Sequence, residues 1–105
     1  MLLDNIRTMD LGEDFEYKKC QQYDRISYKG YKVVEIGYAV KKGKYWLDVI
    51  PQVFDSLTPQ EVQAMEGVRD YDKHIWRLNC RLYINNLYDF IHVFELAVNW
   101  EKNNR

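Results

Sequence analysis

Aromatic and basic side chains are the residues of this chain best suited to recognition chemistry, and one stretch concentrates them. Residues 17–45 hold six of the nine tyrosines and eight of the fifteen lysines and arginines. Aromatic rings stack on flat groups and on cations, while lysine and arginine attract carboxylates and phosphates. The stretch therefore indicates a binding surface, which could serve either a protein or a nucleic acid.

Patterns that would support catalysis or metal binding are sparse. Asp70, Asp72 and His74 alternate, so an extended chain would turn them to one side, where they could hold a divalent ion. A polar loop that leads into a strand accounts for the same triplet, and we favour it. No glycine-rich phosphate loop, no Gly-x-Ser-x-Gly motif and no metal-ligand spacing around Cys20 or Cys80 occurs. We therefore expect no enzyme activity, no bound metal and no cofactor.

Charge lies in blocks of opposite sign along the chain. The net charge is −4 over residues 1–16, +6 over residues 17–45, −5 over residues 46–72 and +2 over residues 73–105, which leaves −1 for the whole chain. Such a chain neither imitates a nucleic acid nor coats one, so any electrostatic attraction must be local.

Length and composition indicate a single α+β domain over residues 1–105. A chain of this length buries roughly two-thirds of its extended surface, which suffices without disulfides or metals. The first ten residues include Asp4 and Arg7 and lack the long apolar run of a signal peptide or membrane anchor. We therefore expect a small soluble protein of the cytoplasm with no membrane partner.

Alternating apolar residues predict an antiparallel sheet of three to four strands, because period two is the strand repeat. The even-numbered side chains of the strands at residues 31–40 and 74–84 should face the core. Tyr38, and Tyr45 beside it, would then be core residues and not part of a binding surface. The predicted strands cover part of residues 16–28, then residues 31–40, 45–50 and 74–84.

Two helices are predicted from their N-cap residues. Thr58 and Glu61 have the spacing of a capping box for a helix that ends near Gly67. Asn86 can cap a second helix that reaches about Trp100. We expect both helices to pack on one face of the sheet, in the order β-β-β-α-β-α, with an optional short helix at the N-terminus.

The sheet face away from the helices is the first candidate surface. Its two acids balance two arginines, so it gains little from phosphates, whereas tryptophan, tyrosine and arginine dominate protein interfaces. A partly solvated face with cross-strand ion pairs would need no partner at all. Its predicted side chains are Tyr31, Val33, Glu35, Trp46, Asp48, Ile50, Ile75, Arg77, Arg81 and Tyr83.

A lysine-rich edge around two turns is the second candidate. It could meet several phosphates with weak, salt-sensitive and nonspecific binding. Lysines at hairpin turns also maintain solubility and block edge pairing, and that reading stays open. The lysines concerned are Lys29, Lys32, Lys41, Lys42 and Lys44.

The final helix carries a second apolar side, formed by Val93, Leu96 and Trp100. A helix that is apolar on two sides must be covered twice. The N-terminal segment, with Leu2 and Ile6, could cover it, and so could a second copy of the chain in a homodimer. We favour the N-terminal segment because it needs no partner.

Together these surfaces predict a non-enzymatic protein-protein interaction module, such as a small stoichiometric inhibitor or regulatory protein of a larger enzyme, which could itself process nucleic acids. A nucleic-acid-binding module that uses the lysine-rich edge is the alternative. The predicted partner-binding residues are Tyr31, Trp46, Arg77, Arg81, Tyr83, Val93, Leu96 and Trp100.

Overall fold

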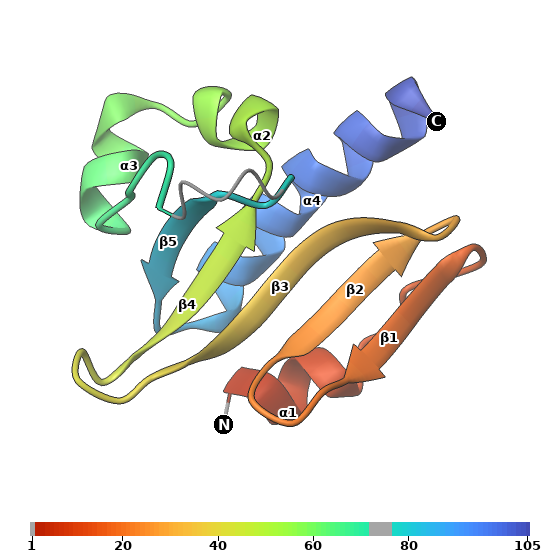
Figure 1. Cartoon of the computed structure of the whole chain (residues 1–105), viewed down its shortest axis with the longest axis horizontal. Coiled ribbons are helices and arrows are strands. Elements are labelled where there is room, and N and C mark those ends of the chain that lie inside the picture. Colours follow the sequence, from red (N-terminus) through yellow and green to blue (C-terminus); the bar gives the residue numbers. More distant parts are fainter. Residues whose placement is uncertain (1, 72–76) are drawn as a thin grey trace.

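Five antiparallel strands form one sheet in which each strand pairs with the next along the chain (Figure 1). The computed structural model describes residues 2–71 and 77–105. Short turns connect the first four strands, and Lys29 and Gly30 both have positive φ between β2 and β3, as two-residue hairpin turns require. The strands are β1 (Phe15–Lys19), β2 (Asp24–Tyr28), β3 (Tyr31–Ala39), β4 (Lys44–Val49) and β5 (Cys80–Ile84).

Helices α1 (Leu2–Arg7) and α4 (Leu87–Asn104) cover one face of this sheet (Figure 1). Helix α4 begins at the predicted Asn86 cap, whose side chain accepts from the backbone N–H of Asp89 at 2.8 Å. The core lies between these helices and the sheet. Its central side chains are fully buried, among them Ile6, Ile26, Ile36, Leu47, Leu82, Phe90 and Val93.

Helices α2 (Pro51–Asp55) and α3 (Pro59–Ala64) lie beside the β4 and β5 end of the sheet (Figure 1). The capping box of Thr58 and Glu61 is present with both of its hydrogen bonds, at 2.8 and 3.1 Å. Helix α3 has no fully buried residue, but Val62 packs partly against the core and Glu61 pairs with His92 of α4. It therefore lies next to the last helix, as predicted, but at the edge of the sheet and not on its face (Figure 1). Helix α1 packs on α4 with Leu2 and Ile6 buried.

The α+β class is confirmed, while the prediction of three to four strands and two helices falls short of the five strands and four helices that the described residues form. The additional strand, β1, is an edge strand whose Phe15 and Tyr17 are only partly buried, which leaves a weak apolar pattern in the sequence. Of the strand predicted over residues 74–84, the part at 80–84 is observed as β5, and residues 74–76 lie outside the described residues.

A β-bulge at Val33 changes which residues of β3 face the helices. Lys32 pairs with Ser27, but Val34 already pairs with Ile26, so Val33 is an extra residue. It is 1% exposed, whereas we predicted it on the open face. Since strand sides alternate, the extra residue turns Lys32 to the side of Glu35 and Tyr31 to the side of α4. The predicted position of Tyr31 on the open face is therefore wrong.

The even-numbered side of β3 is buried only where a helix covers it. Val34 and Ile36 are fully buried, but Tyr38 is 49% exposed, so its prediction as a core residue is wrong. Its strand extends past the helices there, and its ring packs edge-on against buried Tyr45 at 5.0 Å between centroids. Ile50, predicted on the open face, is buried as the N-cap of α2.

A buried carboxylate fastens α1 to the sheet. Asp24 is 1% exposed and accepts hydrogen bonds from Arg7 Nε at 2.8 Å and from the Tyr17 hydroxyl. Burial by itself would raise the pKa of Asp24, but these hydrogen bonds outweigh it and leave the pKa below its ordinary value. Folding therefore favours the charged form of Asp24.

Asp24→Asn should lower the free energy of unfolding at pH 7 by about 2 kcal/mol, because the charge-assisted bonds to Arg7 and Tyr17 are weakened. A carboxyl whose pKa is lowered on folding contributes its stability above its unfolded pKa, about 4, and loses it as the pH falls further. The difference between variant and wild type should therefore shrink at pH 3. Urea denaturation at both pH values measures it.

Glu16→Gln is the matched control, because Glu16 is an exposed carboxylate on β1 next to the same site. Its unfolding free energy should stay within about 0.5 kcal/mol of wild type at both pH values. Equal losses in the two variants would contradict a special role for Asp24.

Candidate functional site

One row of charged side chains crosses the sheet face opposite α1 and α4, which we call the open face. Cross-strand pairing aligns the row in register, because each residue is the Cα partner of the next on the neighbouring strand. Side chains of paired residues point to the same face, so the row forms a continuous line. Its members, from β1 to β5, are Lys18, Arg25, Glu35, Asp48 and Arg81.

Ion pairs organise this row. Arg25 donates to Glu35 at 3.0 Å, and Arg81 donates to both carboxylate oxygens of Asp48 at 2.6 and 2.9 Å. Asp48 is only 8% exposed, so an unpaired charge there would be costly. The hydrogen bond that Arg25 donates to Glu35 raises the pKa of Arg25. Both arginines are thus fixed in place and charged.

Trp46 and the Arg81 guanidinium stack at the β4–β5 side of the open face. The Arg81 guanidinium carbon lies 4.3 Å from the Trp46 ring and 3.9 Å from the Tyr71 ring, so two aromatic faces flank the cation. Trp46 in turn lies across its β3 partner Gly37, where any Cβ would overlap the indole. The missing side chain at Gly37 is therefore what lets the ring lie flat on the sheet.

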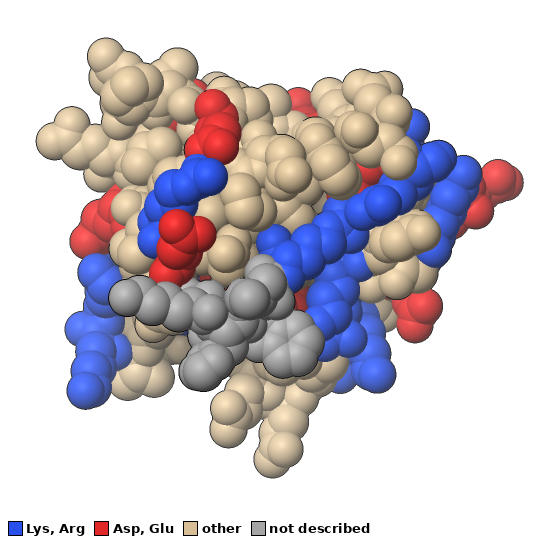
Figure 2. All heavy atoms as spheres, turned by 45° about the horizontal axis from the view of Figure 1, so that its top comes forward, with Lys and Arg blue, Asp and Glu red and all other residues tan. Residues whose placement is uncertain are grey.

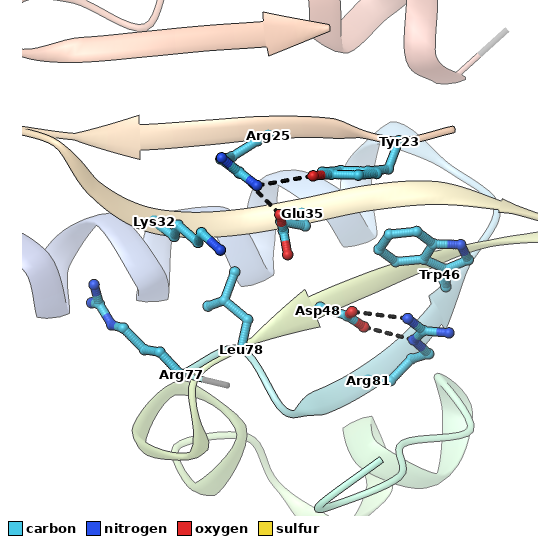
Figure 3. Close-up of a pocket in the computed structure, with 9 residues that line it drawn as sticks. All are labelled: Tyr23, Arg25, Lys32, Glu35, Trp46, Asp48, Arg77, Leu78 and Arg81. Carbon is cyan, nitrogen blue, oxygen red and sulfur yellow. Dashed lines mark hydrogen bonds and ion pairs between the residues drawn. The ribbon is translucent and has the colours of Figure 1, made fainter. Parts of the chain in front are cut away.

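A hollow of about 560 Å³ opens on this face. In Figure 3, Trp46 and Arg81 lie at one end of it, and Lys32 and Arg77 lie at the other. Leu78 projects between the two ends and supplies an apolar side chain. We call this feature the hollow, and its lining residues are Tyr23, Arg25, Lys32, Glu35, Trp46, Asp48, Arg77, Leu78 and Arg81.

A second group of cations, the cationic end, adjoins the hollow at the C-terminus of α4. Its anchor is Glu101, which is 1% exposed, pairs with Arg77 and has Arg105 Nε at 3.6 Å. Both arginines also stack on rings: the Arg105 guanidinium carbon lies 4.0 Å from the Tyr31 ring, and that of Arg77 lies 5.5 Å from Trp100. These five residues define the cationic end.

In the hollow and the cationic end, acidic and basic side chains differ in their exposure to solvent. Their acids lie low, while most of their arginines reach further toward solvent, so the surface that a partner meets is more basic than the composition indicates. Figure 2 shows Lys and Arg gathered in a continuous band on one face. Side-chain exposure is 1% for Glu101, 12% for Asp48 and 17% for Glu35, against 17% for Arg81, 24% for Arg25, 26% for Arg105 and 27% for Arg77.

The predicted partner-binding residues separate into three groups. Trp46, Arg77 and Arg81 meet in the hollow, and Tyr31 and Trp100 join Arg77 in the cationic end. The remaining three residues contribute little accessible surface. Val93 is fully buried against the core, Leu96 is partly buried there, and Tyr83 is 8% exposed with Lys42 over its ring.

Val93 is thus a core residue, and its prediction as a contact for a partner is wrong. Helix α1 packs on α4 with Leu2 and Ile6 buried, while Trp100 on the second apolar side of α4 lies beside Arg77 and Arg105. Ile75 lies outside the described residues.

Sequence reasoning missed Tyr23 and Arg25, and it assigned Lys32 to a different surface. A two-residue turn at Lys29 and Gly30 could have set the register of β2 against β3. Without the bulge, however, that register would have placed Arg25 opposite Val34, so the ion pair to Glu35 could not have been found.

The five lysines of the predicted edge do not form one patch. Lys29 and Lys32 lie at the β2–β3 turn, whereas Lys41, Lys42 and Lys44 lie at the β3–β4 turn, at the other end of the nine-residue strand β3 (Figure 1). Lys42 and Lys44 both pair with Glu66. These five lysines therefore do not form a contiguous phosphate-binding edge.

The described residues hold neither a metal-binding cluster nor a membrane-spanning helix. Within residues 2–71 and 77–105, no group of three or more His, Cys, Asp or Glu side chains could hold a metal ion. Asp72 and His74 of the alternating triplet lie outside those ranges, and Asp70 accepts from the Asn79 amide at 3.2 Å. No helix in the described chain has the length and apolar character needed to cross a bilayer.

Gly37→Ala should displace the Trp46 indole, because the new Cβ overlaps the ring, and should cost about 1–3 kcal/mol of stability. The indole N–H resonance of Trp46 in a ¹H–¹⁵N spectrum reports the movement. Gly67→Ala is the matched control, since its Cβ crowds Val62 and Phe54 instead. An unmoved Trp46 resonance in Gly37→Ala would contradict the proposed contact.

The comparisons with known proteins give this chain no relative from which a role could be transferred. No protein-family model, no curated protein and no solved structure matches it.

Proposed function

We propose that this protein is a protein-protein interaction module that binds its partner through the open face of the sheet. The observation that carries the proposal is the stack of Trp46, Arg81 and Tyr71, with Arg81 held from below by Asp48. Tryptophan, tyrosine and arginine are the residue types that contribute most to binding energy at protein interfaces.

The stack is also preorganised. Arg81 makes two hydrogen bonds to Asp48 and Trp46 lies on Gly37, so little side-chain freedom is left to lose on binding. Ordering a long side chain at an interface costs about 0.5–1.5 kcal/mol, and that cost is met here during folding. This supports a binding role over that of a merely solvated face, whose ion pairs would not need a tryptophan across them.

The dimensions of the molecule suit a one-to-one complex. It measures 33 × 29 × 27 Å, so one face offers the area of roughly 800 Å² that each partner of a standard interface buries. A small chain that covers such an area on a larger protein blocks whatever that surface does. A stoichiometric inhibitor or regulatory protein of a larger enzyme is the form of the proposal that we favour.

Capture from a lysate of the source organism tests the proposal. The immobilised protein, incubated with and without nuclease, should retain a protein partner under both conditions, and the purified pair should form a one-to-one complex. Retention that disappears with nuclease would favour the alternative, a nucleic-acid-binding module, and would contradict a direct protein partner.

Trp46→Ala should weaken the purified complex by at least about 30-fold, the effect of losing roughly 2 kcal/mol at a central aromatic residue. Isothermal titration calorimetry measures the affinity, and circular dichroism verifies the fold. Tyr88→Ala is the matched control, because Tyr88 is 80% exposed on α4, away from the open face. Equal affinities for wild type and Trp46→Ala would sink the proposal.

A further inference from the structure

The hollow and the cationic end form one continuous surface. Arg77 belongs to both, because it lines the hollow and its guanidinium also lies 5.8 Å from the Tyr31 ring and 5.5 Å from the Trp100 ring. A ligand that enters the hollow beside Trp46 can therefore extend past Lys32 and Arg77 to Arg105. The hollow and the cationic end together thus form an elongated surface, which we call the path, with cations along most of its length.

Among the described residues, the partners of three arginines on this path engage only some of their N–H donors. The Glu35 and Tyr23 hydroxyl contacts engage two nitrogens of Arg25, the Asp48 contacts engage two of Arg81, and the Glu101 contact engages one of Arg77. A guanidinium is a planar fork of N–H donors, so an acid beneath one edge directs the other edge outward. Such forks bind carboxylates with paired hydrogen bonds.

Apolar surface accompanies the donors. Leu78 projects into the hollow between Trp46 and Arg77, and the Tyr23 ring lies 6.4 Å from Trp46. A ligand with carboxylates alone would not displace water from this apolar surface. One that carries a large apolar or aromatic side chain next to a carboxylate would use both properties of the hollow.

We infer that the hollow and the cationic end bind an acidic segment of the partner protein, in which Asp or Glu side chains stand next to an aromatic or large apolar residue. The inference rests on the proposed function and names the chemistry of its partner. Carboxylates meet the outer edges of Arg25, Arg77 and Arg105, and the apolar side chain lies against Trp46 and Leu78.

A protein segment fits this surface better than a nucleic acid does. Glu35 and Asp48 lie within the hollow, so a backbone with a phosphate at every nucleotide would have to pass over both acids. Separate carboxylates can be spaced to avoid them. The five lysines of the predicted edge are divided between two distant turns, and Lys42 and Lys44 pair with Glu66.

Fluorescent peptides of defined composition test the inference on the full chain. The probe is a peptide with alternating Glu and Trp, and its controls replace every Glu by Gln or by Lys. Fluorescence anisotropy should give at least about 10-fold tighter binding for the Glu peptide than for the Gln peptide, with an affinity that falls as salt rises. A single-stranded oligonucleotide of similar length is measured alongside.

Lys32→Glu should weaken binding of the Glu peptide by about 10-fold, because it reverses the charge of a side chain that lines the hollow. Lys41→Glu is the matched control, because it makes the same charge change at the exposed β3–β4 turn and should leave affinity unchanged. Lys32→Gln, expected to show a smaller loss, provides a second reading if the charge reversal destabilises the fold.

Peptide binding that moves the Trp46 indole resonance and is weakened by Lys32→Glu alone supports the inference. Equal binding of the Glu and Gln peptides, equal loss in both lysine variants, or tighter binding of the oligonucleotide at the same residues would overturn it. If the peptides fail while Trp46→Ala still disrupts the captured complex, the acidic-segment inference falls and the interaction module stands.

Discussion

The single extra residue at Val33 is the constraint on which both surface sites depend. Because a strand turns alternate side chains to opposite faces, one inserted residue exchanges the faces of everything before it. It brings Arg25 opposite Glu35, turns Lys32 into the hollow and sends Tyr31 toward Arg105 at the end of α4. The bulge therefore connects the core packing of β3 to the chemistry of the open face and of the cationic end.

Burial of acids is the second organising feature. Asp24, Asp48 and Glu101 are all less than 9% exposed, and each is paired with an arginine from a distant part of the chain. Leaving any of these carboxylates without its partner would cost several kcal/mol, so the pairs fix how the elements meet. Asp24 fastens α1 to the sheet, whereas the other two hold arginines at the surface. Buried acid–arginine pairs thus both specify the fold and position the arginines of the proposed binding surface.

This layering changes what the charge balance means. A count of residues gives the open face as many acids as bases among those first identified, which argues against an electrostatic role. In three dimensions the acids lie beneath and most of the arginines lie above them, so the outward groups are mostly donors. A nearly neutral composition is therefore compatible with a surface that selects carboxylates, because a partner senses the accessible groups more strongly than the buried ones.

The sequence by itself determined the elements that local rules govern. The capping box of Thr58 and Glu61, the Asn86 cap and the buried side of β5 all follow from spacing within a few residues. The same alternation places Trp46, Asp48 and Arg81 on the sides of their strands that face away from the core. Tertiary structure alone decided the bulge at Val33, the burial of Val93 in the core and the exposure of Tyr38. Each of these depends on where one element ends against another, and that is a non-local property: neither the period of a strand nor the stripe of a helix says which segment will cover it.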